Sequence, residues 1–354
     1  MADRSARPNT RWIESLSPWP EEFGLERMRA LLRELHDPQR RFASVHVVGS
    51  KGKSTATRTI AALLRAEGVR VGAYTSPHVS GWSERIQVDG ADVDIERALE
   101  RVRAFAERLG ATQFEALTAA AFAEFAAADV EAAAVEAGLG GRLDATNVLD
   151  ARVVLLTNVT REHAEVLGDT PEEIAREKLA VAHPDSIVVL SDNEFGHLVT
   201  GRHVVFGGAR EAAGAFLGRS VATEVNVLLP GRFERRGREV RDGAHTPEAV
   251  RWLLARLPSR DYVLCVSLLA DKDADGVLSA LAEAGTRLVA TTSSNARALS
   301  ADGLADRARP YFEHVEAVPD PRAALARARD LGGAEGAVLV TGSLYLLADL
   351  HSCP

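Results

Sequence analysis

Short runs of β-branched and apolar residues alternate with longer stretches rich in alanine, leucine, glutamate and arginine along most of the chain. This alternation is typical of parallel strands joined by crossover helices, because each helix returns the chain to the same end of the sheet. The first part of the chain is therefore predicted to form an α/β sheet domain. The pattern weakens between about residues 191 and 229 and then resumes, which predicts a second α/β domain from residue 230.

The pattern gives an expected range to each element. Strands are expected at residues 44–48, 71–75, 132–137, 153–157, 187–190, 262–266, 288–291 and 337–340. Helices are expected at residues 54–67, 114–128 and 171–181. Thr170 is predicted to cap the last of these helices and Pro171 to occupy its first position, because a threonine hydroxyl satisfies an unpaired N–H and proline needs none.

The stretch VHVVGSKGKST, residues 45–55, passes from a strand through a glycine turn into a helix. Glycines in such a turn let backbone N–H groups point inward, a lysine adds a cation, and the serine that opens the helix can ligate Mg²⁺. The turn is therefore a candidate nucleotide phosphate site. Val47 stands where the usual pattern has its first glycine, so a glycine turn with solvated lysines is the alternative. The candidate residues are Gly49, Ser50, Lys51, Gly52, Lys53 and Ser54.

Composition excludes several classes of partner. A formal net charge of -8 argues against a general binder of nucleic acid or anionic membranes. Two cysteines, Cys265 and Cys353, are too few for a disulfide framework, which favours a reducing compartment. No apolar run approaches the ~18 residues that a membrane span needs. We expect a cytoplasmic protein, monomeric, with no nucleic-acid or membrane partner.

Three further stretches, in order along the chain, resemble a known family. They are YTSPHVSGWSERIQVDG (74–90), EAGLGGRLDATNV (136–148) and EEIAREKLAV (172–181). With the glycine turn, and with LPGRFE, RDGAHTP and VTGSLYLLAD later on, they resemble folylpolyglutamate synthase/dihydrofolate synthase of the Mur ligase superfamily. The resemblance implies a P-loop ATPase-type domain with a mainly parallel sheet over residues 1–229. A smaller Rossmann-like α/β ligase domain is implied over residues 230–354.

The resemblance also implies a reaction. Enzymes of this family phosphorylate a carboxylate with ATP, and the amino group of glutamate then displaces phosphate from the acyl phosphate. We therefore expect ATP and Mg²⁺ as cofactors and, as substrates, L-glutamate and a pterin carboxylate. The acceptor is either 7,8-dihydropteroate or a folate that already carries glutamate, and the sequence does not separate the two.

The family's metal and acceptor positions fall on residues that are ambiguous when read alone. Taken without the family, Ser76 is a turn residue, Glu136 a strand-end charge, and Thr112 the cap of a helix. The resemblance instead implies a metal site made by Ser54, Ser76, Glu136 and His163. It implies an acceptor site made by Thr112, Gln113, Phe114, Glu115, Leu143, Asp144 and Ala145.

The remaining implied positions lie on one late helix and in the second domain. Arg232 and Asp242 match nucleotide-binding positions, and His245 and Ser343 match positions near the incoming glutamate. Without the family, Asp242 and His245 would merely shape a strand-to-helix turn. Lys178 matches a lysine that the family carboxylates with CO₂, whereas its local sequence alone indicates a solvated helix face. The implied catalytic residues are Lys53, Lys178 and His245.

The match is incomplete at some positions. The family's usual Asp-His pair is Glu162-His163 here, and Thr246 replaces an expected asparagine. The chain is also short by dozens of residues around 194–226, where the family carries a helix that contributes to the ATP site. Two alternatives therefore stay open: a ligase of the same superfamily with another acceptor or amino acid, and a catalytically impaired nucleotide-binding homologue.

Overall fold

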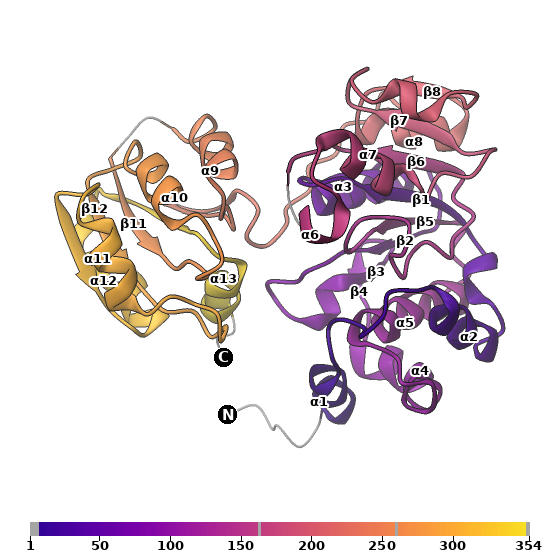
Figure 1. The fold of residues 1–354 in the computed structure, drawn as a ribbon, viewed down its shortest axis with the longest axis horizontal. Coiled ribbons are helices and arrows are strands. Elements are labelled where there is room, and N and C mark those ends of the chain that lie inside the picture. Colours follow the sequence, from indigo (N-terminus) through magenta and orange to yellow (C-terminus); the bar gives the residue numbers. More distant parts are fainter. Residues whose placement is uncertain (1–6, 162–163, 259–260, 352–354) are drawn as a thin grey trace. The chain divides into compact units, whose positions relative to one another are not determined.

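The computed structural model describes residues 7–161, 164–258 and 261–351, which divide into two compact units (Figure 1). The first unit runs to His78 and continues from Trp82 to Val227. The second unit starts at Leu228 and also includes the short segment Val79–Gly81. Each unit is a sheet covered by helices on both faces, which confirms the predicted mixed α/β fold with mainly parallel sheets.

The first unit is built on an eight-stranded sheet with the order β4-β3-β2-β5-β1-β6-β7-β8 in the described residues. All neighbouring strands pair in parallel except in the β2-β3-β4 meander at one edge. The strands are β1 (Ala43–Val48), β2 (Val71–Tyr74), β3 (Ile86–Val88), β4 (Ala91–Asp92), β5 (Ala132–Glu136), β6 (Val153–Leu156), β7 (Ile187–Leu190) and β8 (Val204–Phe206).

Helices cover both faces of this sheet because alternate strand residues are apolar on each side. Helices α3 and α8 pack on the face that carries Val45 and Val47, and helices α4, α5 and α7 lie over the other face. The helices are α1 (Pro8–Ser15), α2 (Glu26–Glu34), α3 (Lys53–Ala66), α4 (Ile95–Leu109), α5 (Gln113–Ala127), α6 (Ala164–Leu167), α7 (Pro171–Leu179) and α8 (Ala209–Leu217). Short 3₁₀ turns are η2 (Pro38–Arg40), η3 (Trp82–Arg85) and η4 (Gly196–Val199).

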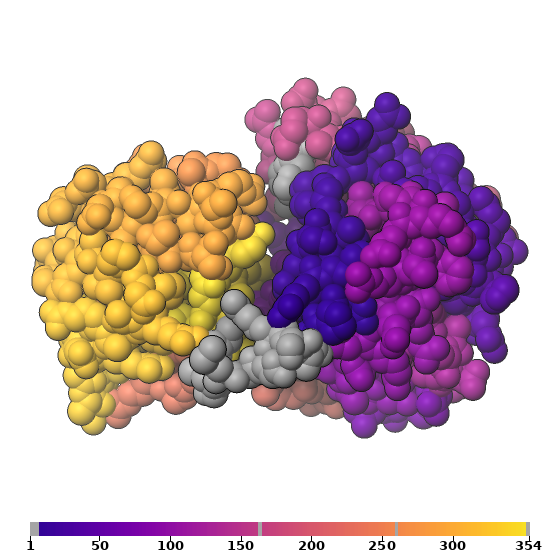
Figure 2. All heavy atoms as spheres, turned by 90° about the horizontal axis from the view of Figure 1, so that it is seen from below, coloured from indigo at the N-terminus to yellow at the C-terminus, as the bar shows by residue number. Residues whose placement is uncertain are grey.

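The two N-terminal helices form an outer layer on α4 and α5. Helices α1 and α2 contact α4, and Figure 2 shows this indigo segment lying against the purple helices that follow it. The carboxylate of Glu96 on α4 accepts hydrogen bonds from the N–H groups of Asn9 (2.9 Å) and Thr10 (3.0 Å), so it caps the start of α1. The chain between α1 and α2 is thereby held over the first turn of α5, where Gln113 N–H donates to the Ser17 carbonyl at 2.9 Å.

The second unit has a six-stranded sheet, β13-β12-β11-β14-β10-β9, in the described residues. Among the strands that the structure describes, the edge strand β9 alone runs antiparallel to its neighbour. The strands of this second sheet are β9 (Glu234–Arg236), β10 (Glu239–Arg241), β11 (Tyr262–Val266), β12 (Arg287–Ala290), β13 (His314–Ala317) and β14 (Ala337–Thr341). Helices α9 (Pro247–Leu254), α10 (Ala274–Leu281) and α11 (Ala301–Ala308) cover one face, and α12 (Pro321–Gly332) and α13 (Leu344–His351) cover the other.

Every strand and helix expected from the sequence is present, with ends that differ by up to two residues. Thr170 caps α7 as predicted, and Glu173 completes a capping box with it. No range was predicted for the remaining elements, among them the helices α1, α2 and α4 and the β3-β4 hairpin. The alternation weakens in the sequence across residues 191–229, yet it continues in the structure, where β8 extends the parallel sheet beside β7 and α8 packs on α3. Within the described residues, no helix has both the length and the hydropathy to span a membrane.

Gly72 on β2 offers a direct test of the packing between the sheet and α5. A Cβ built at this position would lie 2.6 Å from the Phe125 ring, closer than van der Waals contact allows. We expect Gly72→Ala to lower the free energy of unfolding by about 1–3 kcal/mol, the usual cost of overpacking a core. Gly332→Ala, at the last position of α12, where the new methyl group would make only an ordinary 3.8 Å contact with Val263, is the control and should not lower it. Denaturant unfolding of both variants measures the difference; equal stability would contradict the packing described.

Candidate active site

The phosphate-loop candidate lies between the end of β1 and the start of α3, as the sequence predicts. Gly49 has φ +143°, and a Cβ there would lie 2.0 Å from Thr157 Oγ1, so only glycine fits. Gly52 has φ +78° and is the N-cap of α3, where it has no side chain to cap the first N–H groups of the helix. These N–H groups and the positive end of the helix dipole form an anion-binding position, with Lys53 at the first position of the helix.

Residues that follow β6 brace this loop from one side. Asn158 accepts the Lys51 N–H through its side chain at 2.8 Å and the Ser50 N–H through its carbonyl at 3.0 Å. Thr157 donates its hydroxyl to the Lys51 carbonyl at 2.8 Å. The loop is therefore held in shape by the protein itself. These supporting residues were not predicted, although Thr157 ends a predicted strand and Asn158 directly follows it.

Glu136, at the end of β5, joins the phosphate loop to the next strand. Its carboxylate accepts the Ser54 hydroxyl at 3.1 Å and the Ser76 N–H at 3.0 Å, and Glu136 is buried. The structure thus brings together three of the four predicted metal-site residues; His163 lies outside the described residues. A carboxylate and hydroxyl oxygens are hard donors, and Mg²⁺ usually takes one or two carboxylates together with water and substrate phosphate oxygens. The donor set therefore fits Mg²⁺.

Lys178 is buried, with 2% of its surface exposed, and its Nζ donates to the Gly49 carbonyl at 3.1 Å. It lies on the same side of α7 as the buried residues Ile174 and Ala175. The alternative of a solvated-face lysine is therefore wrong. Burial against the sheet brings the amine end of this side chain to the phosphate loop.

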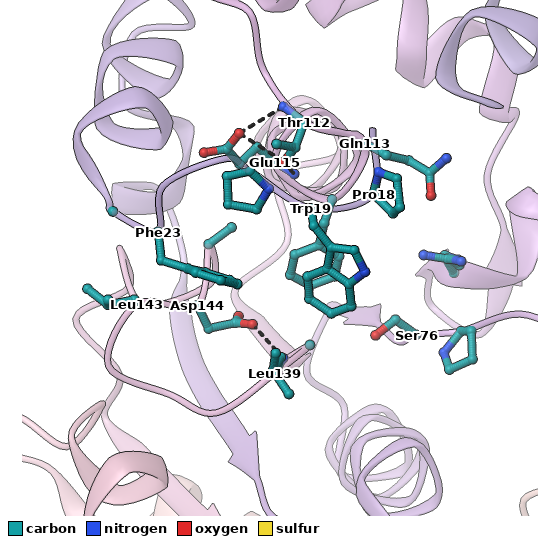
Figure 3. A pocket seen from close by; sticks show the side chains of 17 residues that line it. Pro18, Trp19, Phe23, Ser76, Thr112, Gln113, Glu115, Leu139, Leu143 and Asp144 are labelled. Carbon is teal, nitrogen blue, oxygen red and sulfur yellow. Dashed lines mark hydrogen bonds between the residues drawn. The ribbon is translucent and has the colours of Figure 1, made fainter. Parts of the chain in front are cut away.

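A cavity of about 260 Å³ lies beside this cluster and is lined by all seven predicted acceptor residues (Figure 3). Ser76 also lines it, so one residue borders the cavity and hydrogen-bonds Glu136. The volume is near the lower end of the ~300–1,000 Å³ typical of ligand sites. Its walls come from the segment before α2, the loop after β2, the end of η3, the start of α5 and the loop after β5. The lining residues are Pro18, Trp19, Pro20, Phe23, Gly24, Ser76, Pro77, Arg85, Thr112, Gln113, Phe114, Glu115, Gly138, Leu139, Leu143, Asp144 and Ala145.

Two of the predicted acceptor residues also stabilise the start of α5. Thr112 and Glu115 form a capping box, with Glu115 Oε2 accepting the Thr112 N–H at 2.8 Å and the Thr112 hydroxyl at 2.9 Å (Figure 3). Arg27 Nε donates to the same oxygen at 2.7 Å. The helix-cap interpretation of Thr112 is therefore confirmed, and the same residues form one wall of the cavity.

Asp144 braces the opposite wall. Its carboxylate accepts the N–H groups of Leu139 (2.8 Å) and Thr146 (3.0 Å) and also the Thr146 hydroxyl. Burial raises the pKa of Asp144 above its ordinary value, and the bonds from Thr146 and Leu139 oppose that rise. The loop that carries Asp144 also contacts α7, because Arg142 N–H donates to Glu177 Oε1 at 3.0 Å.

The cavity contains aromatic and cationic residues that sequence reasoning missed. Trp19 and Phe23 lie on the segment between α1 and α2 and flank the cavity in Figure 3, with ring centroids 6.4 Å apart. Arg85 supplies a positive charge; its Nε donates to His78 Nδ1 at 2.9 Å and its guanidinium lies 4.7 Å from the Trp82 ring centroid. Burial, with the nearby Arg85, lowers the pKa of His78 to about 3, so His78 is neutral and can accept this bond. The sequence signal that could have indicated this wall of the cavity was a tryptophan and a phenylalanine within a proline-rich, polar stretch.

The predicted residues of the second unit gather at the carboxyl ends of β10 and β14. Asp242 accepts the N–H groups of Phe233 (2.8 Å) and Ala244 (2.9 Å), and burial raises its pKa while these bonds and Arg232 oppose the rise. His245 Nδ1 lies 2.7 Å from the Gly243 carbonyl, which fixes the ring. Buried Ser343 accepts the Tyr345 N–H at 3.1 Å. One carboxylate oxygen of Asp242 thus holds its own turn and the other holds the segment at Phe233, which agrees with a role in shaping the strand-to-helix turn.

Comparison with known proteins adds independent findings. Residues 47–212 match the Mur ligase middle domain, and residues 231–344 match the Mur ligase glutamate ligase domain. A dihydrofolate synthase/folylpolyglutamate synthase of Mycobacterium tuberculosis is 30% identical over 83% of this chain and 80% of that protein. A probable bifunctional folylpolyglutamate synthase/dihydropteroate synthase of Haloferax volcanii is 32% identical over 93% of this chain, but this chain spans only about half (48%) of its length.

Solved structures agree with these matches. Escherichia coli FolC in complex with DHPP and ADP superposes with a TM-score of 0.85 at 26% identity, over 98% of this chain and 97% of that one. The Yersinia pestis folylpolyglutamate synthase/dihydrofolate synthase complexed with AMPPNP and a Mn ion gives 0.83 at 26% identity, over 99% and 98%. These findings confirm the resemblance predicted from the motifs. The chain belongs to the folylpolyglutamate synthase/dihydrofolate synthase family of the Mur ligase superfamily.

Proposed function

We propose that this chain is an ATP- and Mg²⁺-dependent ligase that joins L-glutamate to the carboxylate of a pterin-bearing acceptor. The observation that carries the proposal is the shared position of Ser76, which borders the cavity and hydrogen-bonds the Glu136 carboxylate beside the phosphate loop. An acceptor carboxylate at that end of the cavity would lie next to a bound nucleotide phosphate. The ligands of the E. coli and Y. pestis relatives, DHPP, ADP, AMPPNP and Mn, support this assignment.

The reaction follows from the residues around the phosphate loop. A carboxylate oxygen of the acceptor attacks the γ-phosphorus of ATP, an O–P bond forms, and ADP leaves. The Lys53 side chain and the N–H groups at the start of α3 stabilise the charge on the transferred phosphoryl group. Ser54, Ser76, Glu136 and His163 are the proposed magnesium residues, and Mg²⁺, when bound, neutralises phosphate charge. The glutamate amine, having lost a proton, then attacks the acyl carbon and releases phosphate.

The cavity suits a flat, polar aromatic ring with a carboxylate at its far end. Trp19, Phe23 and Phe114 provide aromatic surfaces, and backbone and side-chain polar groups lie between them. We propose that Arg85 binds an acceptor carboxylate, because a guanidinium binds carboxylates through paired N–H groups. In the second unit, we propose that Arg232 and Asp242 bind nucleotide and that His245 and Ser343 bind the incoming glutamate.

The wider setting of the enzyme is also a proposal. We propose residues 1–229 as the ATP-binding domain and 230–354 as the ligase domain of a cytoplasmic monomer. The net charge of -8 supports the absence of nucleic-acid and membrane partners, and two cysteines in the chain support a reducing compartment. The enzyme's partners are then its small-molecule substrates: ATP, L-glutamate and a pterin carboxylate.

The first test is substrate dependence. We expect phosphate release to need ATP, Mg²⁺, L-glutamate and a pterin carboxylate together, because acyl phosphate formation and amine attack each need one of them. Purified protein is assayed with dihydropteroate, tetrahydrofolate and a muramyl acceptor, omitting one component at a time. Turnover with the muramyl acceptor alone would show a different ligase, and no turnover with any acceptor would favour the impaired homologue.

The second test removes the charge of Glu136 while keeping its shape. Because Glu136 is the carboxylate beside Ser54 and Ser76, we expect Glu136→Gln to lower kcat/KM for ATP with Mg²⁺ by roughly 10–100-fold, the range seen when partners in a metal site are altered. Steady-state kinetics and calorimetric titration with the magnesium nucleotide measure the effect. Glu100→Gln, at an exposed position on α4, is the control. Wild-type kinetics in the Glu136→Gln variant would refute the proposed metal role.

The third test concerns Lys178, which we propose acts as a carbamate. Its neutral amine would form an N–C bond with CO₂ and release a proton, so that an anion replaces the amine beside the phosphate loop. We expect Lys178→Ala to be nearly inactive and to regain part of its activity in acetate or formate. Wild-type activity should fall when CO₂ and bicarbonate are rigorously removed. Full activity of the alanine variant without an added acid would end the proposal.

A further inference from the structure

A buried row of polar side chains runs from the middle of β1 to the cavity wall. His46 Nε2 lies 2.8 Å from the Thr146 hydroxyl, and that hydroxyl also contacts Asp144 Oδ1. His46 and Thr146 are fully buried, and Asp144 is 6% exposed where it lines the cavity. Neither the sequence motifs nor the proposed reaction assigns a role to His46 or Thr146.

The chemistry of the three groups fixes the direction of the hydrogen bonds. A threonine hydroxyl has one proton to donate, and an ionised carboxylate only accepts. If Thr146 donates to Asp144, it must accept from His46 Nε2–H. His46 Nδ1 is buried and has no hydrogen-bond partner in the described part of the chain, so a proton there would leave an N–H unsatisfied. The neutral Nε2–H tautomer therefore satisfies the row best.

Burial keeps the imidazole in this neutral form. The pKa of His46 is lowered to about 3, mainly because burial penalises the charged ring and also because His183 is nearby. His46 sits opposite Val135 of β5 and Val154 of β6, in the middle of the sheet. The donor that faces Thr146 is thus held on a strand that is paired on both sides.

At the far end of the row, the Asp144 carboxylate holds the backbone of the cavity wall through hydrogen bonds. Asp144 Oδ1 accepts hydrogen bonds from the N–H and the hydroxyl of Thr146, and Oδ2 accepts the Leu139 N–H. A Cβ at Gly138 would lie 3.1 Å from Asp144 Oδ2 and 2.7 Å from the Phe114 ring, so carboxylate, wall and ring are closely fitted. If the carboxylate rotates, the Gly138–Ala145 wall and its contact with Phe114 must shift.

We propose that His46 is a positioning residue for the cavity: through Thr146 it orients the Asp144 carboxylate and so sets the shape of the Gly138–Ala145 wall. This inference rests on the proposed function, in which the cavity takes the pterin carboxylate. His46 does not touch the substrate. Loss of the row should therefore weaken acceptor binding and leave the nucleotide side unchanged, because the phosphate loop is braced separately by Thr157 and Asn158.

The kinetic test uses Thr146→Val, which keeps the shape of the side chain and removes the hydroxyl. We expect the KM for the pterin acceptor to rise by about tenfold or more, and the KM for ATP to stay within about twofold. Thr146→Ser, which retains the hydroxyl, should restore most of the acceptor affinity. Thr291→Val is the matched control, since Thr291 is equally buried and its hydroxyl donates to the Pro319 carbonyl at 3.1 Å. An unchanged acceptor KM in an active Thr146→Val enzyme overturns the positioning role.

A spectroscopic test is independent of turnover. In protein labelled with ¹⁵N-histidine, we expect His46 to show a protonated Nε2 and a bare Nδ1 at neutral pH, and its Nε2 signal to move in the Thr146→Val variant. An imidazolium, or the Nδ1–H tautomer, overturns the proposed row whatever the enzyme's substrate is. Absence of folate-dependent turnover in the wild-type protein, with the expected histidine spectrum, would refute the proposed function while the hydrogen-bonded row stands.

Discussion

The pairing of β5 with two parallel neighbours determines where the chemistry of the first unit can lie. Glu136 stands opposite Val47 on β1, and Val135 stands opposite Tyr74 on β2, so the carboxyl ends of three strands meet at one edge. The phosphate loop follows β1, and Ser76 follows β2. A single buried carboxylate can therefore bind a hydroxyl from one loop and an N–H from the other. A shift of β5 by one residue against both neighbours would turn Glu136 to the opposite face of the sheet and break both bonds.

Helix α7 links the phosphate loop to the loop that carries Asp144. Lys178 reaches the carbonyl of Gly49, and the carbonyl of Lys178 itself lies only 2.5 Å from where a Cβ on Gly141 would be. Glu177, the preceding residue, holds Arg142 of the same loop. One turn of α7 therefore contacts both the phosphate loop and the loop that carries Asp144. The cavity wall and the nucleotide side share this support, even though their individual braces are separate.

The sequence predicted the strands and helices that have strong local signals. The family's motifs indicated the candidate site residues. Strands β6, β7 and β11 are continuous apolar runs, and Thr170-Pro171 marks the start of α7. The burial of Lys178 could not be inferred locally, because PEEIAREKL is mostly charged and only tertiary packing selects which face is covered. Trp19 and Phe23 lie outside regular structure, so their place at the cavity depends on contacts such as Gln113 N–H to Ser17, which join distant segments. The tautomer of His46 depends likewise on Thr146, 100 residues away.

The tripeptide Val79–Gly81 has a consequence for dissecting this protein. It belongs to the second unit, where Val79 is 3% exposed and clusters with Leu346 and Leu347 of α13. Gly231 adjoins it so closely that a Cβ there would lie 3.1 Å from a Val79 methyl group. The second unit is therefore not a continuous stretch of the gene. A fragment that begins at Leu228 lacks one side chain of its own core, and exchange of this unit between relatives must carry the tripeptide as well.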